Sequence, residues 1–147
     1  MSDIALAKGE KFLEDNGKKE GITTTASGLQ YKVITEGTGA QPKATDQVSV
    51  NYRGTLVNGT EFDSSYKRGE PATFALNQVI PCWTEGVQRL KAGGKARLVC
   101  PSEIAYGDRG APPTIPGGAT LIFEVELIEV VKGAAQPGQP GQPGQQK

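Results

Sequence analysis

The sequence contains no histidine among its 147 residues. Histidine is the usual proton carrier near neutral pH, the general base of Ser-His-Asp and Cys-His nucleophiles, and a ligand in most catalytic zinc sites. Its absence excludes most hydrolytic and zinc-dependent mechanisms. We therefore expect neither a metal nor a cofactor.

The sequence also lacks an excess of charge of either sign. Its 16 Lys and Arg residues balance 16 Asp and Glu residues, so the formal net charge is zero. A basic surface is what attracts nucleic acid or anionic lipid, so neither is an expected partner. No apolar run approaches the roughly 20 residues of a membrane-spanning helix, and no transmembrane segment is predicted. The first residues also contain no apolar core of a secretory signal.

Cysteine is scarce as well. Cys82 and Cys100 are the only two, and they do not have the C-x-x-C spacing of redox or metal sites. They are either two buried thiols or one disulfide across a short loop, and the sequence leaves both possibilities open.

Turn-forming residues, in contrast, are abundant, with 20 glycines and 10 prolines. Between them, apolar and polar residues alternate in the short runs that are typical of half-buried β-strands. These runs lie at residues 29–33, 48–53, 74–76, 95–100 and 121–127. Asn58-Gly59 is a strong hairpin signal.

One helical segment interrupts the predicted strands. Pro81 suits a first helical position, and Trp83, Val87 and Leu90 follow at helical spacing before Gly93-Gly94 ends the pattern. The sequence therefore predicts an α+β fold, in which a curved antiparallel β-sheet of about five strands wraps around one short helix.

The two ends of the chain differ from this central part. Residues 1–20 predict an N-terminal helix, whose apolar stripe is so thin that we expect it to fray or to pack against a segment outside this sequence. Residues 134–147 repeat Gln-Pro-Gly without a bulky apolar side chain, so we expect disorder there. The long stretch from 101 to 119, rich in glycine and proline, is the first place to look for function.

Several aromatic residues and one acid have no simple assignment, but each alone has an ordinary structural explanation. A single tryptophan such as Trp83 is usually core, and Asp63 in a Phe-Asp-Ser-Ser segment is usually a turn or cap residue. Their joint arrangement is more informative. It consists of five segments in series: VNYRG at 50–54, GTEFDSS at 59–65, VIPCWTEG at 79–86, AYG at 105–107, and the stretch from Ile115-Pro116 to ATLIFEVEL at 119–127.

Through these segments, residues 27–132 resemble the FKBP family of peptidyl-prolyl isomerases. The stretch that joins FLE at 12–14 to SGLQY at 27–31 is similar to the junction in the bacterial Mip and FkpA subgroup. In that subgroup a long helix leads from a dimerisation domain into the isomerase domain. The resemblance implies that residues 1–20 are the remnant of such a linker helix.

The resemblance implies a hydrophobic pocket for proline with Trp83 as its floor. Asp63, Phe62 and Tyr106 are the expected catalytic residues, with Asp63 beside the twisting imide, Tyr106 as a hydroxyl donor at the rim, and Arg68 supporting the acid. The backbone N–H of Ile80 is expected to bind a peptide carbonyl, and Ile115 to lie on the flap of the long loop. The expected substrate-binding residues are Tyr52, Phe62, Val79, Ile80, Trp83, Tyr106, Ile115 and Phe123.

Some positions depart from the pattern that is common in this family. They belong to the outer pocket, so they affect macrolide binding and the preference for residues beside proline more than catalysis. These positions are Ala72, Gln78, Ala111 and Thr114. Cys82 stands where glycine is frequent in the family. It follows Pro81 at the helix start, and Cys100 ends a strand expected to pack near that helix, so the two cysteines could form a disulfide if the protein is exported.

We therefore expect a peptidyl-prolyl cis-trans isomerase that acts on proline-containing peptides and unfolded proteins, assists folding, and binds rapamycin-type macrolides. The alternative is a non-catalytic peptide-binding or chaperone module of the same fold. An adaptor that acts through the Pro-rich tail is less favoured, because Gln-Pro-Gly repeats lack docking anchors. The resemblance points to the periplasm or the cell surface of a bacterium, with the cytoplasm as the other possibility.

Overall fold

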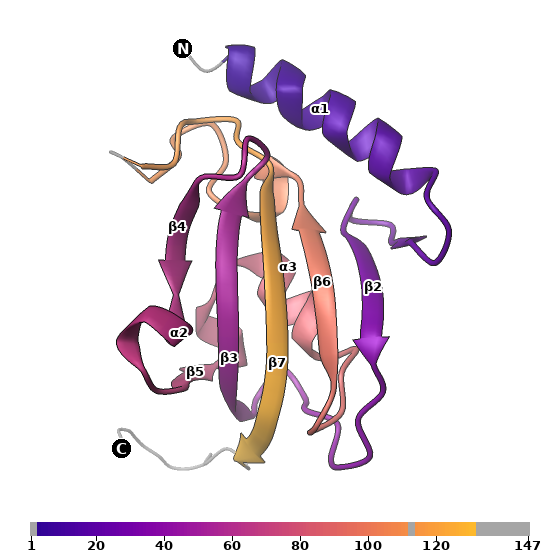
Figure 1. Ribbon diagram of the computed structural model, residues 1–147, viewed down its shortest axis with the longest axis vertical. Helices are drawn as coiled ribbons and strands as arrows, with labels where there is room; N and C mark the ends of the chain where they lie inside the picture. The colour runs from indigo at the N-terminus through magenta and orange to yellow at the C-terminus, as the bar shows by residue number, and fades with distance from the viewer. Residues whose placement is uncertain (1–2, 112–113, 132–147) are drawn as a thin grey trace.

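The computed structural model describes residues 3–111 and 114–131, and Figure 1 shows one β-sheet with helices at its end and behind it. The tail predicted to be disordered, 134–147, lies outside the described residues. The strands are β1 (Thr23–Thr24), β2 (Gln30–Thr35), β3 (Gln47–Leu56), β4 (Glu61–Ser64), β5 (Ala72–Ala75), β6 (Lys95–Cys100) and β7 (Leu121–Val131). The helices are α1 (Asp3–Gly17), α2 (Ser65–Arg68) and α3 (Pro81–Val87), with short 3₁₀ turns η1 (Leu76–Gln78) and η2 (Ser102–Ile104).

The strands form a single antiparallel sheet in the order β1-β2-β6-β7-β3-β4. β5 pairs with the first half of β3, along the same edge as β4. The α+β class predicted from the sequence is confirmed. The sheet has seven strands rather than about five, because the pattern of alternation missed β1, which has two residues, and β4, whose residues had been interpreted as a turn.

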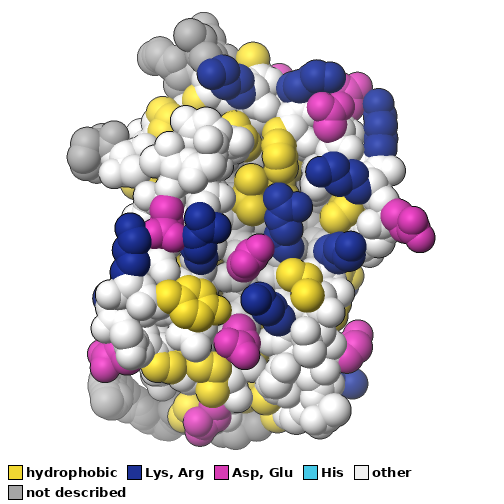
Figure 2. All heavy atoms as spheres, viewed as in Figure 1, with side chains coloured by type: hydrophobic (Ala, Val, Ile, Leu, Met, Phe, Trp, Pro, Cys, Tyr) yellow, Lys and Arg dark blue, Asp and Glu magenta, His cyan; other side chains and the backbone are white. Residues whose placement is uncertain are grey.

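Alternation along β7 separates the two faces of the sheet. Leu121, Val125 and Leu127 are fully buried, and Phe123 is 4% exposed, on the face that packs against α3. In Figure 1, α3 lies behind β6 and β7. The opposite face is polar, and its cross-strand neighbours carry opposite charges, as in Arg97 opposite Glu124. Figure 2 shows this face, on which cationic and acidic side chains are interspersed over the strands.

The helices differ in detail from the sequence prediction. α3 begins at Pro81 as expected but ends at Val87, well before Gly93. Leu90 is buried nonetheless, because the chain continues along the core after the helix. α2 was not predicted. Ser64 caps its start, accepting a hydrogen bond on its side chain from the backbone N–H of Tyr66, and Gly69 caps its end with a φ of 80°.

α1 packs against the rest of this chain, which differs from the expectation that it frays. It crosses the end of the sheet where β6 ends and β7 begins (Figure 1). Asn16 is 1% exposed and donates a hydrogen bond of 2.8 Å from Nδ2 to Oε1 of Gln30, and Gln30 donates from Nε2 to the carbonyl of Leu13 at 2.9 Å. This docking of α1 could not be predicted from the spacing of apolar residues, because it depends on a hydrogen bond between two buried side-chain amides.

Cys82 and Cys100 form a disulfide, which decides between the two possibilities that the sequence left open. The bond joins the second residue of α3 to the last residue of β6, with 5.9 Å between the Cα atoms, and both side chains are fully buried. It therefore ties the helix to the sheet at one defined point.

We expect loss of this disulfide to destabilise the fold. It closes a loop with a sequence separation of 18 residues, and closing a loop of that size is worth about 3 kcal/mol in the chain-entropy account. The double variant Cys82→Ala, Cys100→Ala should lose about this free energy of unfolding in a denaturant titration. Reductant should destabilise the unsubstituted protein and leave the variant unchanged. Equal stability of the variant and of the unsubstituted protein in the absence of reductant would contradict a structural role for the bond.

Candidate active site

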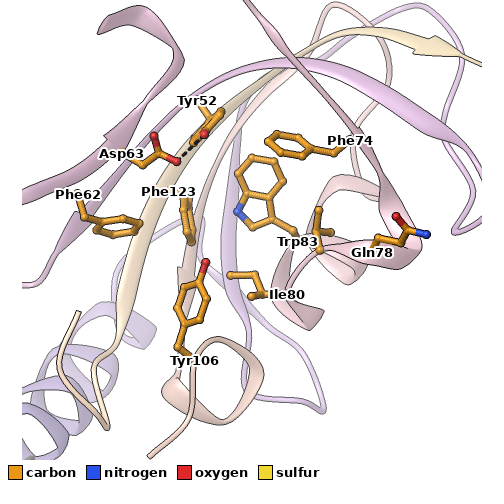
Figure 3. A pocket seen from close by; sticks show the side chains of 10 residues that line it. Tyr52, Phe62, Asp63, Phe74, Gln78, Ile80, Trp83, Tyr106 and Phe123 are labelled. Carbon is orange, nitrogen blue, oxygen red and sulfur yellow. Dashed lines mark hydrogen bonds between the residues drawn. The ribbon is translucent and has the colours of Figure 1, made fainter. Parts of the chain in front are cut away.

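A cavity of ≈ 470 Å³ opens between the sheet and α3 (Figure 3). Its walls come from segments that are far apart in the sequence, and six of its residues are aromatic. The lining residues are Tyr52 on β3, Phe62 and Asp63 on β4, Phe74 on β5, Gln78 in η1, Val79 and Ile80 ahead of α3, Trp83 in α3, Tyr106 in the β6–β7 loop and Phe123 on β7.

Trp83 forms the floor of this cavity and is 4% exposed. Its indole meets the rings of Tyr52, Phe74 and Phe123 at centroid distances of 5.1, 5.4 and 5.4 Å, in each case nearly perpendicular. Edge-to-face contacts of this kind are the favoured aromatic geometry, because the positive edge of one ring meets the negative face of another. The indole is therefore held in one orientation.

Phe62 and Phe123 form the wall next to Asp63, with ring centroids 5.6 Å apart. They meet over Gly54 of β3, where a Cβ would lie 2.6 Å from Phe62 and 2.8 Å from Phe123. Glycine at this position lets both rings lie against the strand. A larger residue at 54 would displace them into the cavity.

Besides the buried Nε1–H of Trp83, which has no hydrogen-bond acceptor among the described residues, two donors remain available at the cavity. Tyr106 is 40% exposed, and Figure 3 shows its hydroxyl directed inward, toward Phe123 and Ile80. Ile80 has the extended conformation of a helix cap, with φ −60° and ψ 149°. Within the described residues, neither the Tyr106 hydroxyl nor the backbone N–H of Ile80 donates to a protein acceptor. Each can bind a carbonyl oxygen of a peptide.

Asp63 is held by hydrogen bonds to both of its carboxylate oxygens. The Tyr52 hydroxyl donates to Oδ2 at 2.6 Å, while Arg68 Nη1 and the backbone N–H of Ser64 donate to Oδ1, each at 2.8 Å. Arg68 also donates from Nη2 to the Tyr52 hydroxyl at 2.9 Å and lies over the ring of Tyr52. The three side chains form a closed triangle.

This triangle keeps Asp63 ionised. Partial burial raises the pKa of Asp63, but the hydrogen bonds from Tyr52, Arg68 and Ser64 outweigh it and leave the pKa below its usual value of 3.8. Burial, followed by the hydrogen bond to Asp63, raises the pKa of Tyr52. At neutral pH the site therefore holds a fixed carboxylate and a neutral phenol, and neither is poised to transfer a proton.

The structure brings together most of the residues that the sequence pointed to. Arg68 is not a lining residue and reaches the site through Asp63, as expected of a supporting residue. Ile115 is 6% exposed, forms a β-bridge with Ala111, and does not line the cavity. Of the four outer positions singled out in the sequence, Gln78 lines the cavity, whereas Ala72, Ala111 and Thr114 do not.

Phe74 is the lining residue that sequence reasoning used only as a strand marker. Its ring packs against both Tyr52 and Trp83. The alternation of residues along β5 places Phe74 on one face of the strand, and this is the same face of the sheet as Tyr52. Assigning that face to the cavity, however, requires the pairing of β5 with β3.

Two further observations concern other kinds of site. Across residues 3–111 and 114–131, no three His, Cys, Asp or Glu side chains are grouped so that they could hold a metal ion. Among the helices in the same part of the chain, none is both long enough and apolar enough to cross a bilayer.

Two family models match the chain. One, described as FKBP-type peptidyl-prolyl cis-trans isomerase, matches residues 38–128, and the other, described as the domain amino terminal to FKBP-type peptidyl-prolyl isomerase, matches residues 1–33. The first contains every residue that lines the cavity. The second contains α1.

Individual relatives agree with these models. FkpA of Aeromonas hydrophila, an FKBP-type peptidyl-prolyl cis-trans isomerase, is 59% identical over 87% of this chain and 47% of its own length. The crystal structure of FkpA from Escherichia coli is 49% identical, with a TM-score of 0.86 over 89% of this chain and 61% of that one. A peptidyl-prolyl cis-trans isomerase from Pseudomonas syringae pv. tomato is 38% identical, with a TM-score of 0.83 over 90% of this chain and 97% of that one.

The chain spans about half the length of the Aeromonas relative, which continues beyond the matched region. The two family models together include the whole cavity and α1.

The hydrogen-bonded triangle makes a prediction about pH. A depressed pKa in the folded state means that Asp63 stabilises the fold above its unfolded pKa, and that this contribution is lost as the pH falls through the folded pKa. A titration of the carboxyl carbon by NMR should place the pKa of Asp63 below 3.8. Tyr52→Phe keeps the ring but removes one donor, so it should raise that pKa. A value at or above 3.8 in the unsubstituted protein would refute the triangle.

Proposed function

The chain belongs to the FKBP-type peptidyl-prolyl cis-trans isomerases, and on that premise we propose that it catalyses cis-trans exchange of X-Pro bonds in extended or unfolded protein segments. The observation that carries this proposal is the apolar cavity floored by Trp83, with free donors at Ile80 and Tyr106. The proline ring binds on the indole, and the two donors bind carbonyl oxygens of the flanking peptide.

The chemistry requires no proton transfer and no covalent intermediate. Rotation about a peptide bond has a barrier of about 18 to 20 kcal/mol, because the amide resonance must be broken. The planar imide is charge-separated, and the twisted imide is less polarised. A dry aromatic cavity therefore disfavours the planar ground state more than the twisted state, and this difference lowers the barrier.

Asp63 acts in this proposal as a fixed charge beside the twisting bond. Both of its oxygens already accept hydrogen bonds, and its depressed pKa keeps it ionised, so it does not serve as a general acid. Arg68 and Tyr52 hold it in place. Phe62, its neighbour on β4, closes the apolar wall against which the proline ring packs.

The rival is a peptide-binding module of the same fold without catalysis. Both functions require the cavity, but only catalysis requires the fixed carboxylate next to it. The intact hydrogen-bonded triangle around Asp63 favours catalysis, because a surface that only bound proline would have no use for a charge held at the edge of an apolar cavity.

We further propose that the protein works in an oxidising compartment, the bacterial periplasm or the cell surface. The disulfide between Cys82 and Cys100 supports this location, because structural disulfides persist in oxidising environments and are rare in the bacterial cytosol. Fractionation of cells that express the natural gene would place the protein, and recovery only from the cytoplasm would reject the proposal.

Substitutions in the cavity should reduce catalysis more than stability. We expect Asp63→Leu and Phe62→Ala each to lower kcat/KM for a proline-containing tetrapeptide by about tenfold or more, equivalent to about 1.4 kcal/mol of transition-state stabilisation. A protease-coupled assay measures the rate, and a denaturant titration of the same samples measures stability.

Matched controls are available outside the cavity. Tyr66→Ala removes an exposed aromatic ring, and Glu70→Leu removes an exposed carboxylate close by in the sequence, and neither residue lines the cavity. Both control variants should keep full activity. Unchanged rates in Asp63→Leu and Phe62→Ala would contradict the site. Peptide binding without any rate acceleration in the unsubstituted chain would favour the non-catalytic module.

Macrolides of the rapamycin type should inhibit the protein, because a macrolide bound in this cavity would occupy the space above Trp83 that the substrate proline needs. Gln78 is the lining residue at which this chain departs from the common family pattern, so it is where affinity is expected to differ. Titration of the isomerase assay with rapamycin measures this. Absence of inhibition throughout the micromolar range would show that the outer cavity does not accept the macrolide.

A further inference from the structure

The middle of α1 packs closely against the loop that carries Tyr106. Gly9 is buried, and a Cβ at this position would lie 2.9 Å from the Cβ of Thr120 and closer still to its Oγ1. Glycine is a poor helix former and alanine is the best, so helix propensity alone would favour alanine here. The close approach of the helix to Thr120 accounts for glycine at position 9.

α1 lies next to both ends of the β6–β7 loop, which comprises residues 101–111 and 114–120 in the described part of the chain, and packs closely against its last residue. Thr120 is its last residue, immediately before β7. At its start, a groove of ≈ 380 Å³ separates α1 from the first residues of the loop. The groove is lined on the helix side by Leu6, Glu10 and Leu13, and on the loop side by Pro101, Ser102, Glu103 and Thr120.

Backbone hydrogen bonds inside the loop connect these ends to Tyr106. The N–H of Gly107 donates to the carbonyl of Ser102 at 2.8 Å, and the N–H of Gly118 donates to the carbonyl of Gly107 at 2.9 Å. The carbonyl of Tyr106 accepts from the N–H of Gly110 at 3.0 Å. Tyr106 is therefore linked through backbone hydrogen bonds to both loop ends, of which α1 contacts the one at Thr120 and faces the other across the groove.

The C-terminal half of α1 is fixed to a different part of the fold. Asn16 and the carbonyl of Leu13 are hydrogen-bonded to Gln30, the first residue of β2. β2 pairs with β6 inside the sheet. α1 is thus attached to the sheet at one end and packed against the loop in its middle, which is the arrangement of a brace.

We propose that α1 braces the β6–β7 loop through the contact of Gly9 with Thr120, and that this contact positions Tyr106 at the cavity. Gly9 is then a positioning residue, 97 residues from the side chain it controls. The proposal rests on the proposed function, because Tyr106 matters as a donor to the bound peptide. It implies that any event that lifts α1 from Thr120 lowers isomerase activity without altering the aromatic floor.

The test uses Gly9→Ala, a substitution that favours the helix but clashes with Thr120. We expect the amides of Gly107 and Gly118 to exchange with solvent about three- to tenfold faster, and kcat/KM to fall by a similar factor. The amides of Val50 and Val125, in the central strands, should exchange at unchanged rates. Lys8→Ala, at the exposed neighbouring position, should change none of these quantities.

A second substitution tests the contact itself. Thr120→Gly removes both side-chain atoms that the new Cβ would meet, leaving the backbone nitrogen of residue 120 at 3.4 Å, which is a tolerable contact. Gly9→Ala should therefore have little effect in the Thr120→Gly background. A full effect of Gly9→Ala in that background, or equal acceleration of exchange in the loop and in the central strands, would overturn the proposal.

Hydrogen exchange is measured without substrate, so it separates this inference from the proposed function. If the unsubstituted chain had no isomerase activity, the proposed function would fail and the exchange rates would still decide whether α1 braces the loop. If activity is present and Gly9→Ala leaves the loop amides unchanged, the brace is refuted and the proposed function stands.

Discussion

The packing of the Trp83 indole between α3 and the sheet is the constraint on which the rest of the structure depends. Three rings from three strands meet the indole almost at right angles, so its position fixes theirs. The disulfide at the preceding residue, Cys82, holds the start of α3 against β6. The result is a cavity whose floor is held in place and whose aromatic walls on β3, β5 and β7 are fixed by their contacts with that floor.

Next to this apolar centre, β4 carries two carboxylates, Asp63 and Glu61, and each of them is paired with nearby cations. On β4, Asp63 faces the cavity with Arg68 and Tyr52, and Glu61 is bound by Lys67 and Arg53 at 2.8 and 2.6 Å. The hydrogen bonds from Lys67 and then Arg53 lower the pKa of Glu61. Because Lys67 and Arg68 are neighbours in α2, one short helix serves both carboxylates. The cavity thus has a charged edge that does not titrate near neutral pH.

The donors at the cavity are positioned by different means. The direction of the Ile80 N–H is set by the backbone that enters α3, beside the floor. Tyr106 lies in a long loop whose order depends on its own turns and on α1. The structure therefore combines a fixed half, made by the sheet and α3, with a half whose geometry depends on how a terminal helix is docked. This division makes α1 part of the site's architecture although none of its residues lines the cavity.

Local patterns in the sequence were sufficient for the fold class, for most strands and for the start of α3, because alternation and a proline at a helix start act over a few residues. Motifs in series also identified Trp83, Tyr52, Phe62 and Phe123 as cavity residues, all of which line it. β4 was missed because Glu61–Ser64 has too few residues to show alternation, and Phe74 was not assigned to the cavity because that depends on which strand β5 joins. Only the tertiary structure decided which residues far apart in the sequence are in contact. Examples are Asn16 with Gln30, Gly9 with Thr120, and Cys82 with Cys100. These contacts form only when two elements pack together in a particular way. The pattern of residues along one helix or strand does not show which other element it will pack against.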